Sequence, residues 1–419
     1  MDQIKSLRKD AMQIAAEAIQ RMLPDEAVKR ALEQFPRDIP GRLLVIAIGK
    51  AAWRMAQTAS EHLGNRVSGG LVITKYGHSM GDIPGFEILE AGHPTPDENS
   101  ERAALRAITL VSGLRPEDQV VLLLSGGGSS LFEQPLPGVS LEEIKDITRQ
   151  LLGSGADITE MNCVRKHLSG VKGGRFAEQC APASIFSIVL SDVLGDSLDV
   201  IASGPAFPDA STSKEASKII DQYQISISDD ARKALMQETP KQLKRCTSIV
   251  TGNVSLLCEA AVEAAARLGY HPTILTTALN WEAREAGRFL AGAAREMRTS
   301  QPGNYALILG GETVVHLSGS GLGGRNQELA LTAALYMEAL EDAVILSIGS
   351  DGTDGPTDAA GGIVDGGTAE RIRLATGRDP QEFLTDNDSH HALDASGDLI
   401  LTGPTGTNVN DLMLVLCHV

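Results

Sequence analysis

Asp118 to Leu124 reads DQVVLLL and leads directly into SGGGSS at Ser125 to Ser130. An apolar run that stops at glycines predicts a buried strand, and strands of this kind decide the fold class. The glycines let backbone N–H groups approach an anion closely, so the loop is a candidate anion site. A tight turn between a strand and a helix is the alternative. The loop does not fit the GxxxxGK[ST] pattern, so it is not a Walker A loop.

Buried runs of the same kind recur through the first half of the chain. Gly41 to Ile48 leads through a glycine to Lys50, and Ser184 to Leu190 leads through a serine to Asp192. Helical stretches separate the runs, and this alternation is typical of a mostly parallel sheet that helices cover on both faces. In such sheets the loops at the carboxyl ends of the strands form the binding site. The sequence therefore predicts an α/β fold with its site at one edge of the sheet.

The second half of the chain alternates in the same way and contains an unusual acidic loop. The apolar run Ala343 to Gly349 leads into SDGTDGPTDAAGG at Ser350 to Gly362. Three aspartates so close in sequence repel one another unless a cation neutralises them. A divalent cation that carries polyphosphate would do so, and a solvated acidic loop is the alternative.

Composition narrows the class of protein. The chain has 419 residues, 42% of them hydrophobic, and a formal net charge of −17. This charge argues against bulk nucleic-acid binding but leaves room for a phosphate pocket with a few local cations. Five cysteines without CxxC spacing indicate free thiols in a reducing cytoplasm. The N-terminal residues have no apolar h-region, so we do not expect a signal peptide, and no apolar run approaches the ~18 residues of a membrane span. We place the domain boundary near residue 240, which gives domains at 1–240 and 241–419.

Four charged residues follow strand ends or open helices. Lys50 can point into the crevice as a point charge for phosphate, and a solvated lysine in the first turn of a helix is its alternative. Arg325 opens a helix where anions collect, and a surface arginine is its alternative. Glu312 follows two glycines at a strand end, which favours a functional role. For Asp192, a Mg²⁺ ligand and a helix cap are equal alternatives.

Three further patterns are ambiguous. Asn162 to Arg175 (NCVRKHLSGVKGGR) is the one basic cluster, and it either lines a carboxylate or phosphate site or forms a solvated helix face. Gly319 to Gly324 matches the G-x-G-x-x-G of a dinucleotide site. We discount that match because the acidic residues Glu341 and Asp342 fall before the next strand instead of at its end. We interpret His93, which lies between a glycine and a proline, as structural.

Several of these motifs, taken in order, together resemble the glycerate 2-kinase family. They are LLSGGGSS at Leu123–Ser130, the Asn162–Arg175 run, Ser191-Asp192 with SGP at Ser203–Pro205, GET at Gly311–Thr313, GGRNQE at Gly323–Glu328 and SDGTDG at Ser350–Gly355. The resemblance covers nearly the whole chain. It implies an N-terminal Rossmann-like α/β/α domain with a parallel sheet, a smaller C-terminal α/β domain of the MOFRL type, and an active-site cleft between them. It also implies ATP-dependent phosphorylation of D-glycerate to 2-phosphoglycerate with Mg²⁺.

The resemblance assigns roles to residues of this sequence. The key lysine and arginine of the family fall on Lys50 and Arg325, and its acidic and amide positions fall on Glu312, Asp351 and Asn408. We therefore expect Lys50, Arg325 and Asp351 to be catalytic, and Asp192, Glu312 and Asp351 to bind the metal. The residues expected to bind substrate or phosphate are Ser125, Gly126, Gly127, Gly128, Ser129, Ser130, Lys166, Asn326 and Asn408.

Other functions remain alternatives at this point. Relatives have been labelled hydroxypyruvate reductases, which would use NAD(P)H. A sensor that binds a sugar acid or a nucleotide without turnover is a third possibility, although the charged residues at strand ends count against it. The partners that we expect are glycerate and ATP, with no nucleic acid and no membrane. The sequence leaves open which loop binds ATP, which binds glycerate, and whether the protein is a monomer or a homodimer.

Overall fold

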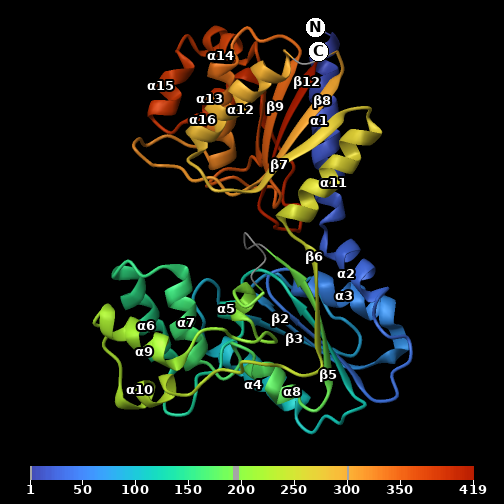
Figure 1. The fold of residues 1–419 in the computed structure, drawn as a ribbon, viewed down its shortest axis with the longest axis vertical. Coiled ribbons are helices and arrows are strands. Elements are labelled where there is room, and N and C mark those ends of the chain that lie inside the picture. Colours follow the sequence, from blue (N-terminus) through green and yellow to red (C-terminus); the bar gives the residue numbers. More distant parts are fainter. Residues whose placement is uncertain (1, 192–197, 300–301) are drawn as a thin grey trace. The chain divides into compact units, whose positions relative to one another are not determined.

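The structure, a computed structural model, describes residues 2–191, 198–299 and 302–419. Asp192, which we expected to bind a metal, lies outside the described residues. The chain forms two compact units (Figure 1). The first unit is Pro24–Thr251, and the second joins Met1–Leu23 to Gly252–Val419.

The first unit is built on a six-stranded sheet made from the apolar runs of the sequence. Its strands are β1 (Leu43–Ile48), β2 (Val67–Lys75), β3 (Phe86–Ala91), β4 (Gln119–Leu124), β5 (Ser184–Leu190) and β6 (Cys246–Gly252). They lie in the order β3-β2-β1-β4-β5-β6, and the pairs from β3 to β5 are parallel. This is the strand order of the doubly wound Rossmann fold, in which the order reverses between β1 and β4. The Rossmann-like prediction is confirmed.

Helices cover both faces of this sheet. They are α2 (Pro24–Leu32), α3 (Ala52–Leu63), α4 (Glu98–Val111), α5 (Gly128–Leu131), α6 (Leu141–Gly153), α7 (Ile158–Leu168), α8 (Arg175–Cys180), α9 (Ser213–Gln222) and α10 (Asp229–Leu235), with short 3-10 turns η1 (Gly64–Arg66) and η2 (Ile201–Ser203). Because alternate side chains of a strand point to opposite faces, Ile46 packs toward α4 and α8 while Val45 packs toward α2 and α3. Helices α6, α7, α9 and α10 share a small core of their own.

The second unit contains a mixed sheet. Its strands are β7 (His271–Leu279), β8 (Asn304–Gly311), β9 (Ala343–Gly349), β10 (Gly361–Asp365), β11 (Leu399–Ile400) and β12 (Asp411–His418). They lie in the order β11-β10-β9-β12-β8-β7. Strands β7 and β8 pair in parallel, and the pairs from β8 through β12, β9 and β10 to β11 are antiparallel. Strands β8 and β9 consequently end at the edge where β12 begins, and Asp411 pairs with both Gly311 and Gly349 there.

The helices of the second unit also form two layers. They are α1 (Asp2–Arg21), α11 (Val254–Arg267), α12 (Ala283–Met297), α13 (Arg325–Tyr336), α14 (Thr368–Thr376), α15 (Pro380–Thr385) and α16 (Ser389–Ser396). Helices α1 and α11 pack on one face of the sheet, while α12 and α13 pack on the other. Helix α13 has no solvent-exposed face from Asn326 to Ala334, because all of these residues, polar and apolar, are buried. It is the central helix of this unit, and its first residue is Arg325.

This division of the chain differs from the boundary that we expected at residue 240. Strand β6 completes the first sheet, so the first unit extends to Thr251. Helix α1 belongs to the second unit because its apolar stripe, which includes Leu7, Ala11 and Ile14, packs in the same core as α11 and β12. The stripe was visible in the sequence, but nothing local indicated the distant segment on which it packs.

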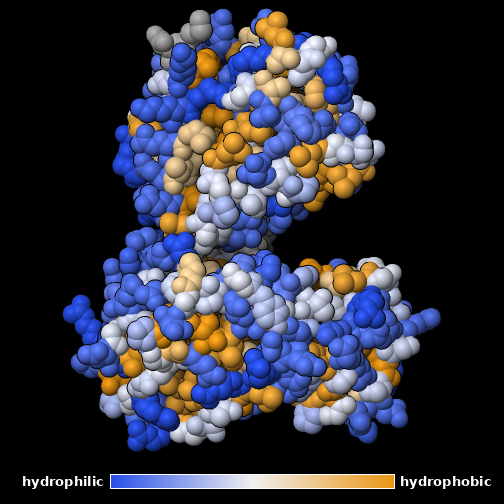
Figure 2. Space-filling view, turned by 180° about the vertical axis from the view of Figure 1, so that it is seen from behind, coloured by the Kyte–Doolittle hydropathy of each residue, from blue (hydrophilic) through white to orange (hydrophobic). Residues whose placement is uncertain are grey.

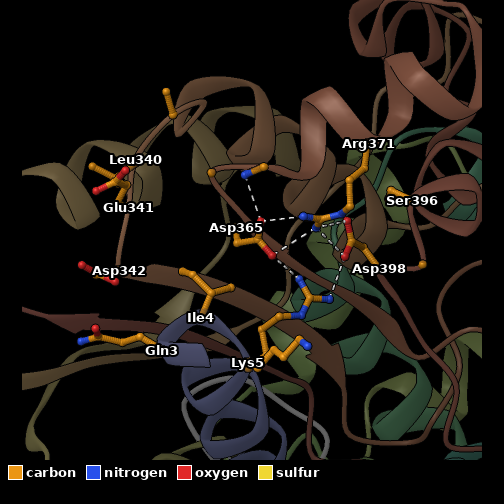
Figure 3. Close-up of a pocket in the computed structure, with 15 residues that line it drawn as sticks. Gln3, Ile4, Lys5, Leu340, Glu341, Asp342, Asp365, Arg371, Ser396 and Asp398 are labelled. Carbon is orange, nitrogen blue, oxygen red and sulfur yellow. Dashed lines mark hydrogen bonds and ion pairs between the residues drawn. The ribbon is translucent and has the colours of Figure 1, made fainter. Parts of the chain in front are cut away.

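Four charged side chains fix α1 within the second unit (Figure 3). Arg8 of α1 donates to Asp365 Oδ2 at 2.6 Å and to Asp398 Oδ1 at 2.7 Å. Arg371 of α14 donates to the same two carboxylates at 2.9 Å. Burial alone would raise the pKa of Asp365, but its bonds to Arg371 and the charge of Arg8 lower it. The four residues line a cavity of about 800 Å³ near the beginning of β9.

The surface carries mixed polarity. Figure 2 shows hydrophobic residues at several places among hydrophilic residues, which is usual for a water-exposed surface. Among the described residues, no helix is both long enough and apolar enough to cross a membrane.

Candidate active site

Lys50 and the Ser125–Ser130 loop lie side by side at the carboxyl ends of β1 and β4. The backbone N–H of Lys50 donates to the carbonyl of Gly126 at 2.9 Å, and the N–H of Ser125 donates to the carbonyl of Ile48 at 3.0 Å. Ligands of doubly wound folds bind where the strand order reverses, which here is between β1 and β4. The structure therefore brings two of the sequence-predicted groups together at this point.

Gly49 allows the ends of β1 and β4 to lie this close. Its φ is +128°, and a Cβ at this position would lie 2.2 Å from Oγ of Ser125. That hydroxyl accepts a hydrogen bond from the N–H of Ala51 at 3.1 Å. A side chain at position 49 would therefore displace the loop, and only glycine fits.

Gly127 faces two basic side chains. A Cβ on Gly127 would lie 3.3 Å from Cε of Lys50 and 3.1 Å from Nε2 of His93, so the two side chains border the same space. Burial lowers the pKa of His93, and the positive charges of Lys50, Lys75 and His78 lower it further. The imidazole is therefore neutral at pH 7. We interpreted His93 as structural from the sequence, and its contact with this loop was not foreseen.

The two serines at the end of the loop differ in their surroundings. Ser130 donates from Oγ to the carbonyl of Gly127 at 3.1 Å, within the turn itself. Ser129 Oγ lies 2.7 Å from Ser203 Oγ. The carbonyl of Ser129 accepts a hydrogen bond from Nη2 of Arg165 at 3.3 Å. Ser130 is therefore used to shape the loop, whereas Ser129 lies beside an arginine.

Lys166, which we expected to bind substrate, is instead a buried structural cation. Its Nζ lies 2.9 Å from Asp199 Oδ2 and 3.3 Å from Asp209 Oδ1. Asp209 also accepts hydrogen bonds from Ser211 and Thr239. A buried cation with two carboxylate partners is already neutralised, so this geometry argues against the expected role.

Arg325 is held rigidly at the start of α13. Its Nε donates to Asp411 Oδ2 at 2.6 Å and its Nη2 donates to Asp411 Oδ1 at 2.9 Å. Its Nη1 lies 2.9 Å from Glu312 Oε1. A bidentate pair fixes both the position and the plane of a guanidinium group. About a third of the Arg325 side chain remains exposed, so its outer edge can meet an anion.

The Arg325–Asp411 pair is electrostatically unusual because Asp411 is fully buried. Burial raises the pKa of Asp411 to about 6, although its hydrogen bond from Arg325 acts in the opposite direction. Burial works against the charge of Arg325, but the bond to Asp411 outweighs it, and the pKa of the guanidinium is raised. Asp411 was not among the site residues predicted from the sequence. Its signal was a lone acidic residue at the start of the apolar run DLMLVLC.

Asn326, which we expected to contact substrate, is fully buried and serves the protein interior. Its side-chain carbonyl accepts from Ser347 Oγ at 2.6 Å, and its Nδ2 donates to Asp354 Oδ1 at 3.3 Å. Asp354 also accepts from the backbone N–H groups of Asn326 and Gln327 at 3.1 Å and 2.9 Å. Burial raises the pKa of Asp354. Asp354 therefore caps α13, and the geometry argues against a ligand at Asn326.

Asp351 and Asn408 are the accessible polar groups at this edge of the sheet. Asp351 lies two residues beyond β9, is partly exposed, and accepts from the N–H of Thr353 at 3.0 Å. Asn408 is exposed on the loop before β12, and its side-chain oxygen accepts from the N–H of Asn410 at 3.4 Å. In the described part of the chain, Asp351 forms no ion pair. Both side chains are thus open to a ligand.

The two expected metal ligands that the structure describes, Glu312 and Asp351, are not part of a preassembled cluster of described residues. No three His, Cys, Asp or Glu side chains gather as a metal site would require within residues 2–191, 198–299 and 302–419. Glu312 is paired with Arg325, and its Oε2 accepts from Nδ2 of Asn410 at 3.3 Å. Asp351 is then the expected ligand with the most freedom to meet a cation. A site of this kind suits Mg²⁺, which takes one or two carboxylates together with substrate phosphates and waters.

The G-x-G-x-x-G match is explained by packing. A Cβ on Gly319 would lie 2.3 Å from the carbonyl oxygen of Asp386, and one on Gly321 would lie 2.4 Å from Cβ of Asp388. A Cβ on Gly324 would lie 2.3 Å from Cγ of Asp354. These glycines are required where the segment presses against another part of the same unit, which supports the decision to discount a dinucleotide site.

Two sequence families match the chain. A domain of unknown function, DUF4147, matches residues 10–236, and the MOFRL family matches residues 305–411. Each match falls largely within one half of the chain, and together they leave unmatched only the two ends and the segment between them.

Known proteins are similar to the chain over its whole length. A D-glycerate 2-kinase from Thermotoga maritima is 54% identical over 417 residues, which are 98% of this chain and 99% of the relative. A protein of Agrobacterium vitis provisionally named a hydroxypyruvate reductase is 41% identical over 401 residues, which are 94% of this chain and 90% of the relative. The crystal structure of a glycerate kinase from Thermotoga maritima matches with a TM-score of 0.95 and 54% identity, over 99% of this chain and 100% of that chain.

Proposed function

The chain belongs to the glycerate 2-kinase family of phosphotransferases, and we propose that it phosphorylates the 2-hydroxyl of D-glycerate with ATP. The single observation that best supports the proposal is the fixed position of the Arg325 guanidinium. Two hydrogen bonds to a buried aspartate hold this group, and one of its edges stays exposed. In phosphoryl transfer, the protein chiefly positions the reactants and supplies charges that neutralise the transferring group. A guanidinium fixed in this way is suited to that task.

The first unit carries groups of its own that suit an anionic reactant. We assign Lys50 to a phosphate group, because it combines a mobile point charge with a fixed backbone bond to Gly126. The loop from Ser125 to Ser130 offers its backbone to an anionic reactant. Neutral His93 beside Lys50 can accept the proton that the attacking hydroxyl loses.

Asp351 is the residue that we assign to Mg²⁺. When bound, Mg²⁺ neutralises charge on the phosphate groups. Asp351 fits this role because it is partly exposed and unpaired in the described chain, whereas Glu312 already pairs with Arg325. Glu312 is better described as a second anchor for Arg325.

We also propose that the protein works in the reducing cytoplasm. All five cysteines are free thiols, and four of them are buried. An oxidising compartment would put such thiols at risk, whereas a reducing one preserves them.

Hydroxypyruvate reductase is the second candidate function, and the name given to the relative from Agrobacterium vitis is the observation that favours it. That activity would need a nicotinamide dinucleotide site. The glycines of the only G-x-G-x-x-G match that we noted are used for packing, which weakens this candidate.

A pair of assays separates the two functions. Purified protein is incubated with D-glycerate, ATP and Mg²⁺, and the product is identified by phosphorus NMR, which distinguishes 2-phosphoglycerate from 3-phosphoglycerate. A parallel sample receives hydroxypyruvate and NADH, and its absorbance is followed. We expect ADP and 2-phosphoglycerate in the first sample and no change in the second. NADH oxidation without ATP turnover would reverse the conclusion, and 3-phosphoglycerate would overturn the assignment to the 2-hydroxyl.

A further inference from the structure

We propose that Arg165 binds the carboxylate group of the acceptor substrate. The inference deepens the proposed function and rests on it, because that function supplies a substrate with a carboxylate. The observation behind it is the position of Arg165 beside the Ser129 end of the loop that follows β4, without a carboxylate partner among the described residues.

Arg165 differs from the three cations nearest to it in sequence. Lys166 pairs with two aspartates, and Lys172 pairs with Glu133. Arg175 donates to the backbone carbonyls of Lys166 and Ser169 at 2.9 Å and 2.6 Å. Within the described chain, Arg165 donates only to the carbonyl of Ser129, at 3.3 Å, and no carboxylate lies within ion-pair distance of it.

One nitrogen of Arg165 has nothing to bind in the protein. Its Nε is buried and, among the described residues, donates no hydrogen bond. A buried donor without an acceptor destabilises the folded protein by about 1–3 kcal/mol, and by more when it is charged. A ligand that accepts a hydrogen bond from Nε would remove this cost. The same side chain is only partly buried as a whole, which leaves its outer part accessible.

The charges around Arg165 do not balance. Lys172 and Glu133 are both fully buried and pair with each other. Burial lowers the pKa of Arg165, and the charge of Glu133 opposes that shift. Burial also lowers the pKa of Lys172 to about 8, with Glu133 opposing and Arg165 adding to the shift. Among the described residues, Glu133 pairs with Lys172 and acts on Arg165 only at longer range, which leaves one positive charge in excess there.

This excess selects the kind of anion. A single carboxylate balances a single positive charge, whereas a polyphosphate would bring several negative charges toward buried Glu133. The guanidinium group also offers two parallel N–H donors, which match the two oxygens of a carboxylate. Lys50 contacts the loop at Gly126 and Gly127, so the loop presents one cation near its beginning and another at Ser129.

The test compares a charged substrate with a neutral one. In Arg165→Ala we expect the KM for D-glycerate to rise about 100-fold, the size of a lost charge-assisted bidentate pair. The KM for ATP and the kcat at saturating D-glycerate should stay within about twofold. Glyceramide, in which the carboxylate is replaced by a neutral amide, should be phosphorylated equally by both proteins. Added guanidinium ion should restore part of the affinity for D-glycerate.

Two further variants make the result interpretable. Arg149→Ala on α6 removes the same charge from an exposed ion pair with Asp146, and its KM for D-glycerate should not change. Arg165→Lys keeps the positive charge, so it should fold even if Arg165→Ala does not. It loses the paired N–H donors of the guanidinium group, so it should still raise the KM for D-glycerate about tenfold.

Several results would overturn the inference. One is an equal loss with D-glycerate and glyceramide, which would indicate that Arg165 only supports the loop. Another is a rise in the KM for ATP in place of that for D-glycerate, which would assign Arg165 to a nucleotide phosphate. If the unaltered protein does not phosphorylate D-glycerate at all, the proposed function fails first and independently of any variant.

Discussion

Asp411 accepts two hydrogen bonds from Arg325, at 2.6 Å from Nε and at 2.9 Å from Nη2. Asp411 is the first residue of β12, and it lies between the ends of β8 and β9. The guanidinium is thus fixed by the sheet itself and not only by its own helix. Rigid placement of this kind is what a cation needs if it is to stabilise a charge that develops during the reaction.

Arg325→Lys should abolish most of the activity while leaving the chain folded. Lysine keeps the positive charge but cannot make the paired bonds to Asp411, so the charge is no longer fixed. We expect kcat to fall about 100-fold or more, as for loss of other groups that stabilise a transition state. Steady-state kinetics with D-glycerate measures this. Near-normal turnover in Arg325→Lys would contradict a role at the transferring phosphoryl group.

Asp411→Asn should remove a pH dependence of stability. The pKa of Asp411 in the folded protein is raised to about 6 by burial, against the bond from Arg325. An unfolded aspartate titrates near about 3.9, so the folded state binds the proton more tightly between about pH 4 and pH 6. The contribution of Asp411 to the unfolding free energy is therefore largest below about pH 4 and is lost as pH rises through about 6.

Denaturant unfolding between pH 4 and pH 7 compares the two proteins. The unfolding free energy of the unaltered protein minus that of Asp411→Asn should decrease as pH rises, because asparagine does not titrate. A difference that stays constant across this range would mean that Asp411 keeps an ordinary pKa.

Asp351→Asn should weaken the use of Mg²⁺. Removing one charged ligand should raise the Mg²⁺ concentration for half-maximal activity about tenfold, by analogy with single ligand-shell losses. Asp358→Asn is the matched control, because Asp358 lies in the same loop with 83% of its side chain exposed. Titration with Mn²⁺ in the presence of ATP, followed by electron paramagnetic resonance, reports the same change without turnover. An unaltered titration in Asp351→Asn would remove Asp351 from the metal site.

Gly49→Ala should destabilise the first unit and disturb the loop. The new Cβ would lie 2.2 Å from Ser125 Oγ, at a φ of +128°. Strain at such a position costs about 1–3 kcal/mol before the clash is counted. Gly113→Ala is the control, since Gly113 also has a positive φ of +71° but has nothing within 4 Å of the added atom. Thermal unfolding should show a larger loss of stability for Gly49→Ala than for Gly113→Ala. Equal losses of stability would mean that the clash with Ser125 Oγ contributes nothing.

Arg8→Met should destabilise the second unit. It leaves two buried aspartates with Arg371 as their remaining partner among the four residues, and breaking a buried pair costs about 3–5 kcal/mol. Arg8 is itself partly exposed, so we expect the lower part of that range. Arg267→Met removes an exposed pair with Glu17 and should cost less than about 1 kcal/mol. If calorimetry finds the two variants equally stable, the cluster of Arg8, Asp365, Arg371 and Asp398 does not stabilise the second unit.

The strands were predictable because long apolar runs stay buried whatever surrounds them. The run from Ala343 to Gly349 is β9, and the run at Gly41 to Ile48 contains β1. The boundary at residue 240 was not predictable from local sequence, because the position of α1 depends on segments that follow hundreds of residues later. The partners of individual charged side chains were likewise not predictable from local sequence.

Arg165 and Lys166 show why the partners of charged side chains could not be predicted from the sequence. They are neighbours in sequence, but successive residues of a helix point about 100° apart, so the two side chains meet different groups. Lys166 finds Asp199 and Asp209, which lie 33 and 43 residues further along the chain. No spacing rule connects residues at such separations. The member of the cluster that has no carboxylate partner among the described residues became visible only in the structure.

The ion pair between Arg8 and Asp398 joins residues that are 390 positions apart. During synthesis, α1 leaves the ribosome long before its carboxylate partners, Asp365 and Asp398, are made. The first unit is one continuous segment and can fold while the remainder is still being made. For that whole interval α1 carries an apolar stripe with nothing to cover it. The core that covers α1 includes β12 and can therefore be completed only after Asp411–His418 has been synthesised.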